Sequence, residues 1–295
     1  GVVTTLAGGT GYPGSTDATG TAARFKLPTD VAVDLTGNVF VADAGNHTIR
    51  KVTSAGVVTT LAGTAGSTGS TDATGTAARF NAPSGVAVDS SGNVFVTDRN
   101  NHTIRKVTSV GVVTTLAGGS GSSGSTDATG TSARFNFPDG IAVDSSGNVF
   151  VADSNNHTIR KVTSAGVVTT LAGTAVSSGF TDGTGAAARF NAPTGVAVDS
   201  VGNVFVTDFN NHTIRKVTSA GVVTTEAGVA GSSGSNNGLG SIARFQSPTG
   251  IAVNSAGNVF VGDYLNHTIR NAVLSAPATV TLSDLSKTYT GTAQA

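Results

Sequence analysis

The stretch Asp98-Arg-Asn-Asn-His102 places an acid, a base and a histidine within five residues. An acid beside a histidine can form half of a catalytic dyad, and both side chains can be metal ligands. The same Asp-x-x-x-His spacing occurs five times and includes all five histidines of the chain. Any chemistry assigned to one pair must therefore be weighed against a repeated structural role. The pairs are Asp43 and His47, Asp98 and His102, Asp153 and His157, Asp208 and His212, and Asp263 and His267.

Internal repetition decides the organisation of the chain. The segments GVVTT and NHTIR each recur five times at a step of 55 residues, without insertions. We therefore expect one repeat domain over residues 1–275, made of repeats 1–55, 56–110, 111–165, 166–220 and 221–275. Residues 276–295 differ in sequence and are assigned to a tail, the start of a further β module or a linker.

Each repeat predicts four β-strands. In the second copy, Gly85–Asp89 is short and nearly all apolar, as in a strand buried on both faces. The turn Ser-Ser-Gly-Asn leads to a second strand, Asn93–Asp98, and the turn Arg-Asn-Asn leads to a third, His102–Thr108. Gly111–Gly118 forms the fourth, and a linker rich in Gly, Ser and Thr follows it. Four antiparallel strands per unit at this period predict an all-β fold, a β-propeller.

The two ends of the repeat array bear on the number of blades. Gly1–Gly8 is an outer strand that precedes any inner strand, and Asn266–Ser275 is a third strand without its usual GVVTT partner. Pairing the two predicts five blades closed by the N-terminal strand. The alternative is that Ala278–Leu282 supplies the last outer strand, in a six-bladed ring or a longer array.

The pattern P-x-G-[VI]-A-V-D-x-x-G-N-V-F-V-x-D-x-x-N-H-T-I-R-K-V resembles the NHL repeat, and the resemblance covers all five copies. It implies a propeller, usually of six blades. Some NHL-like propellers resemble lyases with metal-bound histidines and a tyrosine at the channel, and some NHL domains bind RNA. The tail segment SKTYTGTAQA is similar to the start of small β modules in bacterial secreted surface proteins.

Residues present in every copy favour a structural role. We expect each repeated Asp to accept a hydrogen bond from the imidazole or from turn amides, and so to fasten neighbouring strands. No repeat holds a second histidine, and zinc needs three clustered protein ligands, so we predict no metal site and no catalytic residue. The Asp34 set lacks the spacing of a calcium-binding EF-hand and predicts a hairpin turn. No cofactor is expected; an ion such as calcium in the central channel is the alternative.

Residues that break the repeat are the better candidates for a specific site. The turn before NHTIR and the linkers should emerge on one face of the propeller, where aromatic and charged exceptions collect. Exposed aromatic side chains with an arginine are typical of a contact surface, although drift in exposed loops would give the same pattern. Asp30 and Asp139 are odd acids in nonadjacent repeats, which disfavours a paired-carboxylate glycosidase. The predicted binding residues are Tyr12, Arg99, Asp139, Phe180, Phe209, Tyr264 and Leu265.

The composition of the chain limits the classes of partner that we expect. The net charge is zero, which argues against nucleic acid, and no apolar run is long enough for a membrane span. The chain starts at Gly1 and has no methionine, so we expect it to be an excerpt of a longer protein. The sequence favours a non-catalytic binding or scaffold module of a secreted or cell-surface bacterial protein. Its partner would be a protein, a glycan or another copy; the alternative is an NHL-like lyase or another metal-dependent enzyme.

Overall fold

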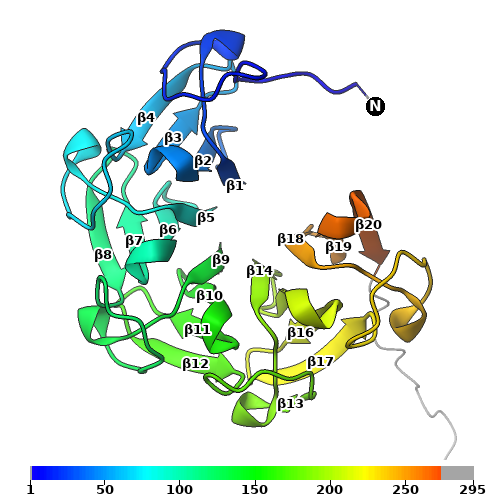
Figure 1. The fold of residues 1–295 in the computed structure, drawn as a ribbon. Coiled ribbons are helices and arrows are strands. Elements are labelled where there is room, and N and C mark those ends of the chain that lie inside the picture. Colours follow the sequence, from blue (N-terminus) through cyan, green and yellow to red (C-terminus); the bar gives the residue numbers. More distant parts are fainter. Residues whose placement is uncertain (1, 274–295) are drawn as a thin grey trace, which may run out of the picture.

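The β-prone segments of each repeat form one antiparallel sheet, and five such sheets surround a central axis (Figure 1). The computed structural model describes residues 2–273. Each sheet is a blade, numbered 1 to 5 along the chain. The first strands, nearest the axis, are β1 (Pro28–Val33), β5 (Pro83–Val88), β9 (Pro138–Val143), β14 (Pro193–Val198) and β18 (Pro248–Val253).

The second and third strands follow in sequence order, and each pairs with its predecessor. The second strands are β2 (Val39–Asp43), β6 (Val94–Asp98), β10 (Val149–Asp153), β15 (Val204–Asp208) and β19 (Asn258–Asp263). The third strands are β3 (Thr48–Val52), β7 (Thr103–Val107), β11 (Thr158–Val162), β16 (Thr213–Val217) and β20 (Thr268–Val273).

The outer strands complete four of the blades. They are β4 (Val58–Ala62), β8 (Val113–Ala117), β12 (Val168–Ala172) and β17 (Val222–Ala227), and the short β13 (Gly183–Thr184) adds to the outer edge of β17. In blade 5 the described strands are β18, β19 and β20. The predicted all-β propeller with four-stranded antiparallel blades and five blades is confirmed.

Two sets of short 3₁₀ helices connect the strands. Those in the linkers are η1 (Gly20–Ala22), η3 (Gly75–Ala77), η5 (Gly130–Ser132), η7 (Gly185–Ala187) and η9 (Gly240–Ile242). Those between second and third strands are η2 (Ala44–Asn46), η4 (Arg99–Asn101), η6 (Ser154–Asn156), η8 (Phe209–Asn211) and η10 (Tyr264–Asn266). Within residues 2–273, no helix is long and apolar enough to cross a membrane.

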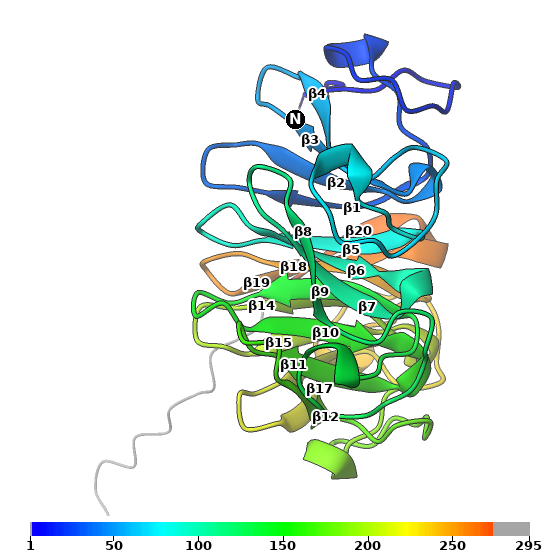
Figure 2. The same ribbon diagram turned by 90° about the vertical axis from the view of Figure 1, so that its left-hand side faces the viewer.

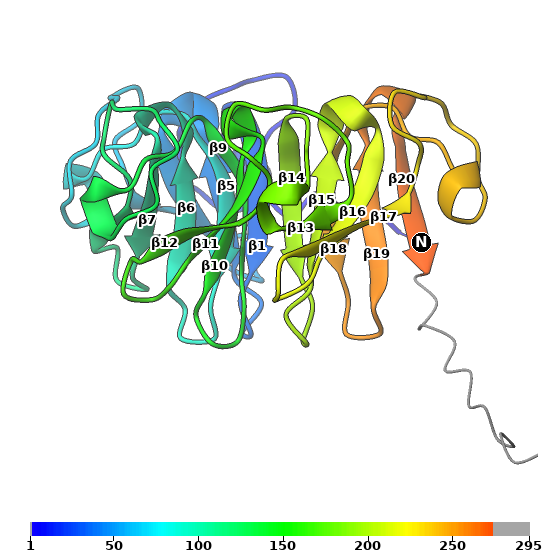
Figure 3. The ribbon, with the colours of Figure 1, turned by 90° about the horizontal axis from the view of Figure 1, so that it is seen from below.

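The two ends of the propeller differ. Figure 3 shows the 3₁₀ helices between second and third strands on one side and the hairpins that join first and second strands on the other. We call the side of η2, η4, η6, η8 and η10 the turn face. Linkers reach this face too, because Gly66 N donates to Asn46 O and Asn46 Nδ2 donates to Gly14 O. The predicted meeting of turns and linkers on one face is therefore confirmed.

The core lies in the seams between blades. In the first seam, Phe40 and Ile49 of blade 1 pack against Val86, Val94 and Val96 of blade 2. In blades 2 to 4 both faces of the central strands are covered by neighbouring blades, which explains why Val-Phe-Val is apolar throughout rather than alternating. Figure 2 shows the blades stacked in this way from the side.

The ring is open between blades 5 and 1 (Figure 1). The predicted closure is wrong: Val2 and Val3 are 94% and 96% exposed, and no described residue pairs with the outer edge of β20. Gly8 N instead donates to Gly20 O, which holds this end of the chain against blade 1. The alternative outer strand, Ala278–Leu282, and the tail lie outside the described residues.

Candidate functional site

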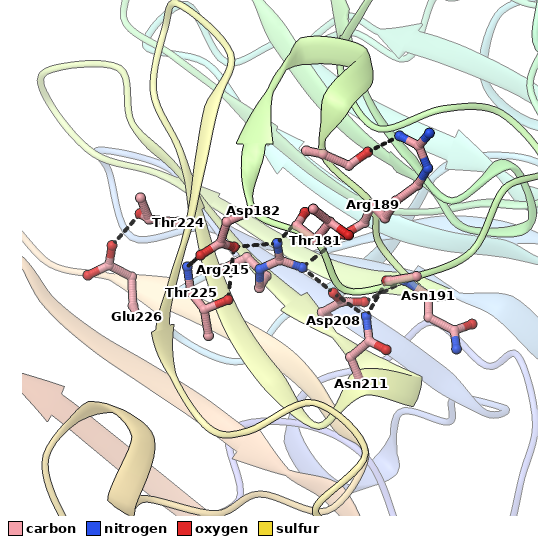
Figure 4. A network of polar contacts seen from close by, with 12 residues as sticks. Thr181, Asp182, Arg189, Asn191, Asp208, Asn211, Arg215, Thr224, Thr225 and Glu226 are labelled. Atoms are coloured by element: carbon pink, nitrogen blue, oxygen red, sulfur yellow. Dashed lines mark hydrogen bonds and ion pairs between the residues drawn. The ribbon is translucent and has the colours of Figure 1, made fainter.

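The repeated aspartate forms a buried ion pair. In blade 4, Asp208 Oδ2 accepts from Arg215 Nη1 at 2.8 Å and from Asn211 Nδ2 at 2.7 Å, and its Oδ1 accepts from the Asn191 amide (Figure 4). Arg215 Nη2 reaches Asp182 in the linker at 2.7 Å. This network ties two strands to the linker that crosses their ends.

The same network is present in every blade, with Asn237 in place of the linker aspartate in blade 5. Each arginine also lies over the phenylalanine of its linker, at 5.0 Å for Arg50 and Phe25. Burial raises the pKa of Asp98, Asp153 and Asp208 to about 6, although the neighbouring arginine opposes that rise. Of the two donors expected for the repeated aspartate, the imidazole does not bond to it within the described residues, where an arginine, an asparagine and a backbone amide occupy the carboxylate.

The histidines connect neighbouring blades instead. His102 has φ of 59°, so the chain turns sharply there and the ring points to the next blade. Its Nδ1 accepts the Phe137 N–H at 3.1 Å. The imidazoles of blades 1, 3 and 4 accept the equivalent amides of the blades that follow them, at 3.0 to 3.1 Å. Burial lowers the pKa of His102, which keeps Nδ1 available as an acceptor.

The variable first residue of the turn-face helices lies at the seam. Ala44 and Ser154 are buried, and Ser154 Oγ donates to Pro193 O of the next blade at 2.6 Å. Phe209 is half-buried, whereas Tyr264 and Leu265 on blade 5 are exposed beside the open gap. The repeat position predicted to lie on an exposed contact surface is therefore buried or half-buried in blades 1 to 4 and exposed in blade 5.

Arg99, His102 and Asp139, which the sequence singled out, lie near one another around the ring of Phe137. The Arg99 guanidinium stacks over the Phe137 ring at 5.0 Å, across the seam between blades 2 and 3. The His102 ring meets the edge of the same phenyl ring at 4.7 Å. Burial raises the pKa of Asp139, and the positive charge of Arg99 lowers it. The charges of Arg99 and Asp139 are therefore close enough to interact. Tyr12 and Phe180 are exposed on separate linkers and do not join this group.

The first strands of all five blades line a central funnel of about 260 Å³. One repeat position supplies a ring of short polar side chains to it, and the next position supplies mostly glycine. Asp139 replaces a hydroxyl in the first ring, and Asp30 replaces a glycine in the second. The polar ring consists of Thr29, Ser84, Asp139, Thr194 and Thr249.

Close packing against the next blade explains the glycines beside that ring in blades 2 to 4. A Cβ on Gly140 would lie 2.3 Å from Thr194 O, so a side chain there would clash with the next blade. Blade 1 accommodates Asp30 through a different bulge, between Pro28 and Asp30. Asp30 Oδ2 accepts the Val86 N–H of blade 2 at 2.9 Å. Burial raises the pKa of Asp30 to about 6, and the nearby Asp139 contributes to that rise.

The funnel therefore brings together two acids that the sequence placed in nonadjacent repeats. Sequence reasoning missed the funnel as a site, because the two acids occupy consecutive repeat positions and were not seen as parts of adjoining rings. The signal was present in the alignment of the copies, where both positions precede the same apolar strand segment. Glu226, another odd acid, accepts from Thr224 Oγ on the outer strand β17 and does not line the funnel (Figure 4).

The acids of the hairpin turns have a structural use. Asp34 Oδ1 accepts from the amides of Thr36 and Asn38, and Oδ2 accepts from Asn38 Nδ2. This is the hairpin turn predicted from the sequence, and it closes the link between first and second strands.

Relatives share both the sequence motif and the architecture. The chain is 30% identical over 231 residues to Protein SUPPRESSOR OF QUENCHING 1, chloroplastic, of Arabidopsis thaliana, covering 73% of this chain and 22% of that protein. It is 36% identical over 156 residues to NHL repeat-containing protein 2 of Bos taurus, covering 47% of this chain and 21% of that protein. The chain thus spans about a fifth of the length of these relatives.

Solved structures with the same fold are more distant in sequence. An auxiliary nutrient binding protein from Bacteroides ovatus matches with a TM-score of 0.62 at 21% identity, covering 87% of this chain and 60% of that one. Virginiamycin B lyase from Staphylococcus aureus matches with a TM-score of 0.54 at 14% identity, covering 85% and 71%. The NHL repeat model matches residues 25–52, 80–107, 135–162, 190–217 and 245–270, so the chain belongs to the NHL-repeat β-propellers.

Proposed function

We propose that the chain is a non-catalytic binding module of a secreted or cell-surface bacterial protein, and that its ligand enters the central funnel from the turn face. The observation that carries this proposal is the convergence of Asp30 and Asp139, two non-repeated acids, on a funnel otherwise lined by hydroxyls and glycines. Carboxylates and hydroxyl oxygens accept hydrogen bonds from hydroxyl and ammonium groups, and hydroxyls also donate to hydroxyl oxygens. A glycan, or a protein segment presenting such groups, fits this lining.

The use of the remaining polar groups supports a binding role. The buried aspartates hold arginines, and four of the histidines accept backbone amides of the next blade. These residues are committed to structure. The naming of a fold neighbour from Bacteroides ovatus as an auxiliary nutrient binding protein points in the same direction.

Repeat-matched substitutions test the proposal. Asp139→Thr with Asp30→Gly gives the funnel the residues of the other blades, so folding should be preserved. We expect an array of neutral and amino-sugar glycans to reveal a ligand that binds the parent chain and loses at least about tenfold in affinity to the double variant. Leu35→Ser, which restores the repeat residue on the opposite hairpin face, should bind like the parent. Equal binding by all three proteins would contradict the proposal.

A second candidate is catalysis in the funnel. The observation that favours it is the pKa of Asp30, which burial raises to about 6 in a cavity beside a second acid. A carboxyl group of that kind can act as a general acid or base near neutral pH. Turnover of a bound glycan that disappears in Asp30→Asn, with binding retained, would establish this function in place of the first.

A further inference from the structure

Arg99 differs from every other arginine within residues 2–273. The others donate hydrogen bonds from their guanidinium groups to carboxylate or backbone oxygens, whereas within this range no hydrogen bond from the Arg99 side chain is found. Arg99 is half-buried, and its guanidinium lies 5.0 Å from the centroid of the Phe137 ring. Its N–H donors are therefore available to a ligand while the ring fixes their plane.

The Phe137 ring is a fixed support for that guanidinium. The Phe137 backbone has φ of 50°, in the left-handed region, like the equivalent residues of the other blades. Its N–H donates to His102 Nδ1, and the His102 ring meets the edge of the phenyl ring at an interplanar angle of 88°. A binding group that is held in place before the ligand arrives loses less entropy on binding.

The Arg–Phe pair departs from the repeat at both of its positions. The equivalent positions at the other described seams hold small or uncharged residues, so neither member of the pair is needed to build a seam. Asp139, the acid that replaces a hydroxyl in the funnel, belongs to the same seam. Three departures from the repeat therefore meet in one place. The residues at the other seams are Ala44 with Ala82, Ser154 with Ala192, and Phe209 with Ser247.

This seam lies at the mouth of the funnel. Arg99 begins η4 on the turn face, and Asp139 is the second residue of β9, which starts at that face. The charge of Arg99 lowers the pKa of Asp139, so the two side chains interact, yet no ion pair joins them within residues 2–273. A ligand that enters from the turn face can therefore contact both.

The charges at this mouth fit a carboxylate better than a phosphate. The planar fork of a guanidinium matches the two oxygens of a carboxylate. Asp139 and the nearby Asp30 oppose a ligand group that brings two negative charges. A singly charged, planar anion at Arg99 is therefore favoured.

The ring of short polar side chains in the funnel favours sugar hydroxyls. Thr29 Oγ1 donates to Ser84 O at 2.8 Å, and Ser84 Oγ donates to Asp139 O at 3.2 Å. Because these protons are used between blades, the hydroxyl oxygens are left to accept hydrogen bonds from a ligand. The funnel measures about 260 Å³, less than the about 300 to 1,000 Å³ typical of pockets for drug-sized ligands, which suits a single sugar residue.

We propose that Arg99 is the carboxylate-binding group of the funnel, and that the ligand is a uronic acid, a sugar residue with one carboxylate. The carboxylate pairs with Arg99 on the Phe137 ring, and the sugar hydroxyls donate to Asp139 and to the hydroxyl oxygens around it. This inference rests on the proposed function, because it requires the ligand to occupy the funnel.

Matched sugars test the class of ligand. The methyl glycosides of glucuronic, galacturonic and mannuronic acid are each compared with the neutral hexoside by isothermal titration calorimetry. We expect the parent chain to bind at least one uronate at least about tenfold more tightly than its neutral counterpart, because the uronate adds a charge-assisted hydrogen bond. That preference should decrease as the salt concentration rises.

Two repeat-matched variants separate Arg99 from other cations. Arg99→Ser gives blade 2 the residue of blade 3, and Lys106→Asn gives it the residue of blade 5. Lys106 also lies over a phenyl ring, 5.9 Å from the Phe95 centroid, but on β7, toward the opposite end of the blade. We expect Arg99→Ser to bind uronate and neutral sugar about equally, while Lys106→Asn keeps the preference of the parent chain.

The outcomes distinguish this inference from the proposed function. Loss of the uronate preference in Arg99→Ser alone supports the inference. An unchanged preference in Arg99→Ser, an equal loss of both sugars in that variant, or a parent chain that prefers no uronate would overturn it. In those cases, neutral-sugar binding that disappears in the Asp139→Thr, Asp30→Gly chain would still support the proposed function.

Discussion

The Asp–Arg ion pair recurs in all five blades. In blade 2 the side chains of Arg105 and Asp98 are both fully buried, and their atoms lie 2.8 Å apart. Removal of Arg105 would leave the Asp98 charge buried without a cationic partner, and removal of Asp98 would leave Arg105 with only the half-exposed Asp72. The pair is thus a stability element rather than a reactive one.

Substitution of the aspartate tests this role. Asp98→Ala should lower the free energy of unfolding by about 3 kcal/mol, because Arg105 would lose its buried carboxylate partner and keep only the half-exposed Asp72. Asp72→Ala removes the second, 46%-exposed partner of the same arginine and should cost about 1 kcal/mol. Urea denaturation measures both; equal losses would contradict the assignment.

The acid of the funnel makes a pH-dependent contribution. The pKa of Asp30 is about 6 in the folded chain and ordinary, near 3.8, when unfolded. Between these values the folded state binds more protons, so this group's contribution to stability falls as pH rises from about 4 to about 6.

Asp30→Asn should remove that contribution. Relative to the variant, the parent chain should lose up to about 3 kcal/mol of unfolding free energy between pH 4 and pH 6. Denaturation curves at closely spaced pH values give the comparison. Parallel pH profiles for the two proteins would show that Asp30 titrates normally.

The strands of each blade could be predicted from the sequence, whereas the contacts of the turns could not. Continuous apolar segments such as Val94–Val96 and glycine-containing turns specify strands and hairpins locally. The partner of His102 depends on its positive φ, which directs the ring away from Asp98 and toward the next blade. Such a backbone conformation is rare outside glycine and has no signal in hydrophobic patterning.

The funnel could not be located from the sequence, for a related reason. Its lining requires the first strands of nonadjacent blades to converge, which depends on the number and angle of the blades. The odd character of Asp30 and Asp139 was evident, but their proximity was not. The open ring likewise depends on the seam angle, which one repeat does not reveal.

The histidine bridge between blades can be isolated by a matched pair. His102→Ala and His267→Ala both place alanine at a positive φ and share that cost. Of these two histidines, only His102 accepts an amide from a following blade within the described chain. His102→Ala should therefore be the more destabilising by about 1 to 2 kcal/mol in chemical denaturation. A smaller effect at His102 than at His267 would refute the bridge.

The molecule as a whole is a ring of blades that each contact only their neighbours, so its ends differ from its interior. Residues 2–6 have the sequence of an outer strand but no partner strand among the described residues. The same sequence in blade 1 forms β4, where Thr60 N donates to Asp17. Identical sequence with different environments permits a direct comparison.

Proline substitutions at equivalent positions compare the N-terminal segment with β4. Thr60→Pro removes an amide used in β4 and should lower unfolding free energy by about 2 kcal/mol. Thr5→Pro, one repeat earlier, should leave thermal unfolding unchanged because its strand is unpaired. Destabilisation by Thr5→Pro comparable to that by Thr60→Pro would show that the N-terminal strand is paired.

The open ring is tested most directly by a disulfide in the five-repeat chain itself. If the N-terminal strand closed the ring, Thr4 would face Asn271, as Thr59 faces Lys51 in blade 1. Oxidation of the Thr4→Cys, Asn271→Cys chain is followed by mass spectrometry and non-reducing electrophoresis. An open ring predicts that both thiols stay free in the monomer, and rapid, quantitative formation of an intramolecular disulfide would contradict it.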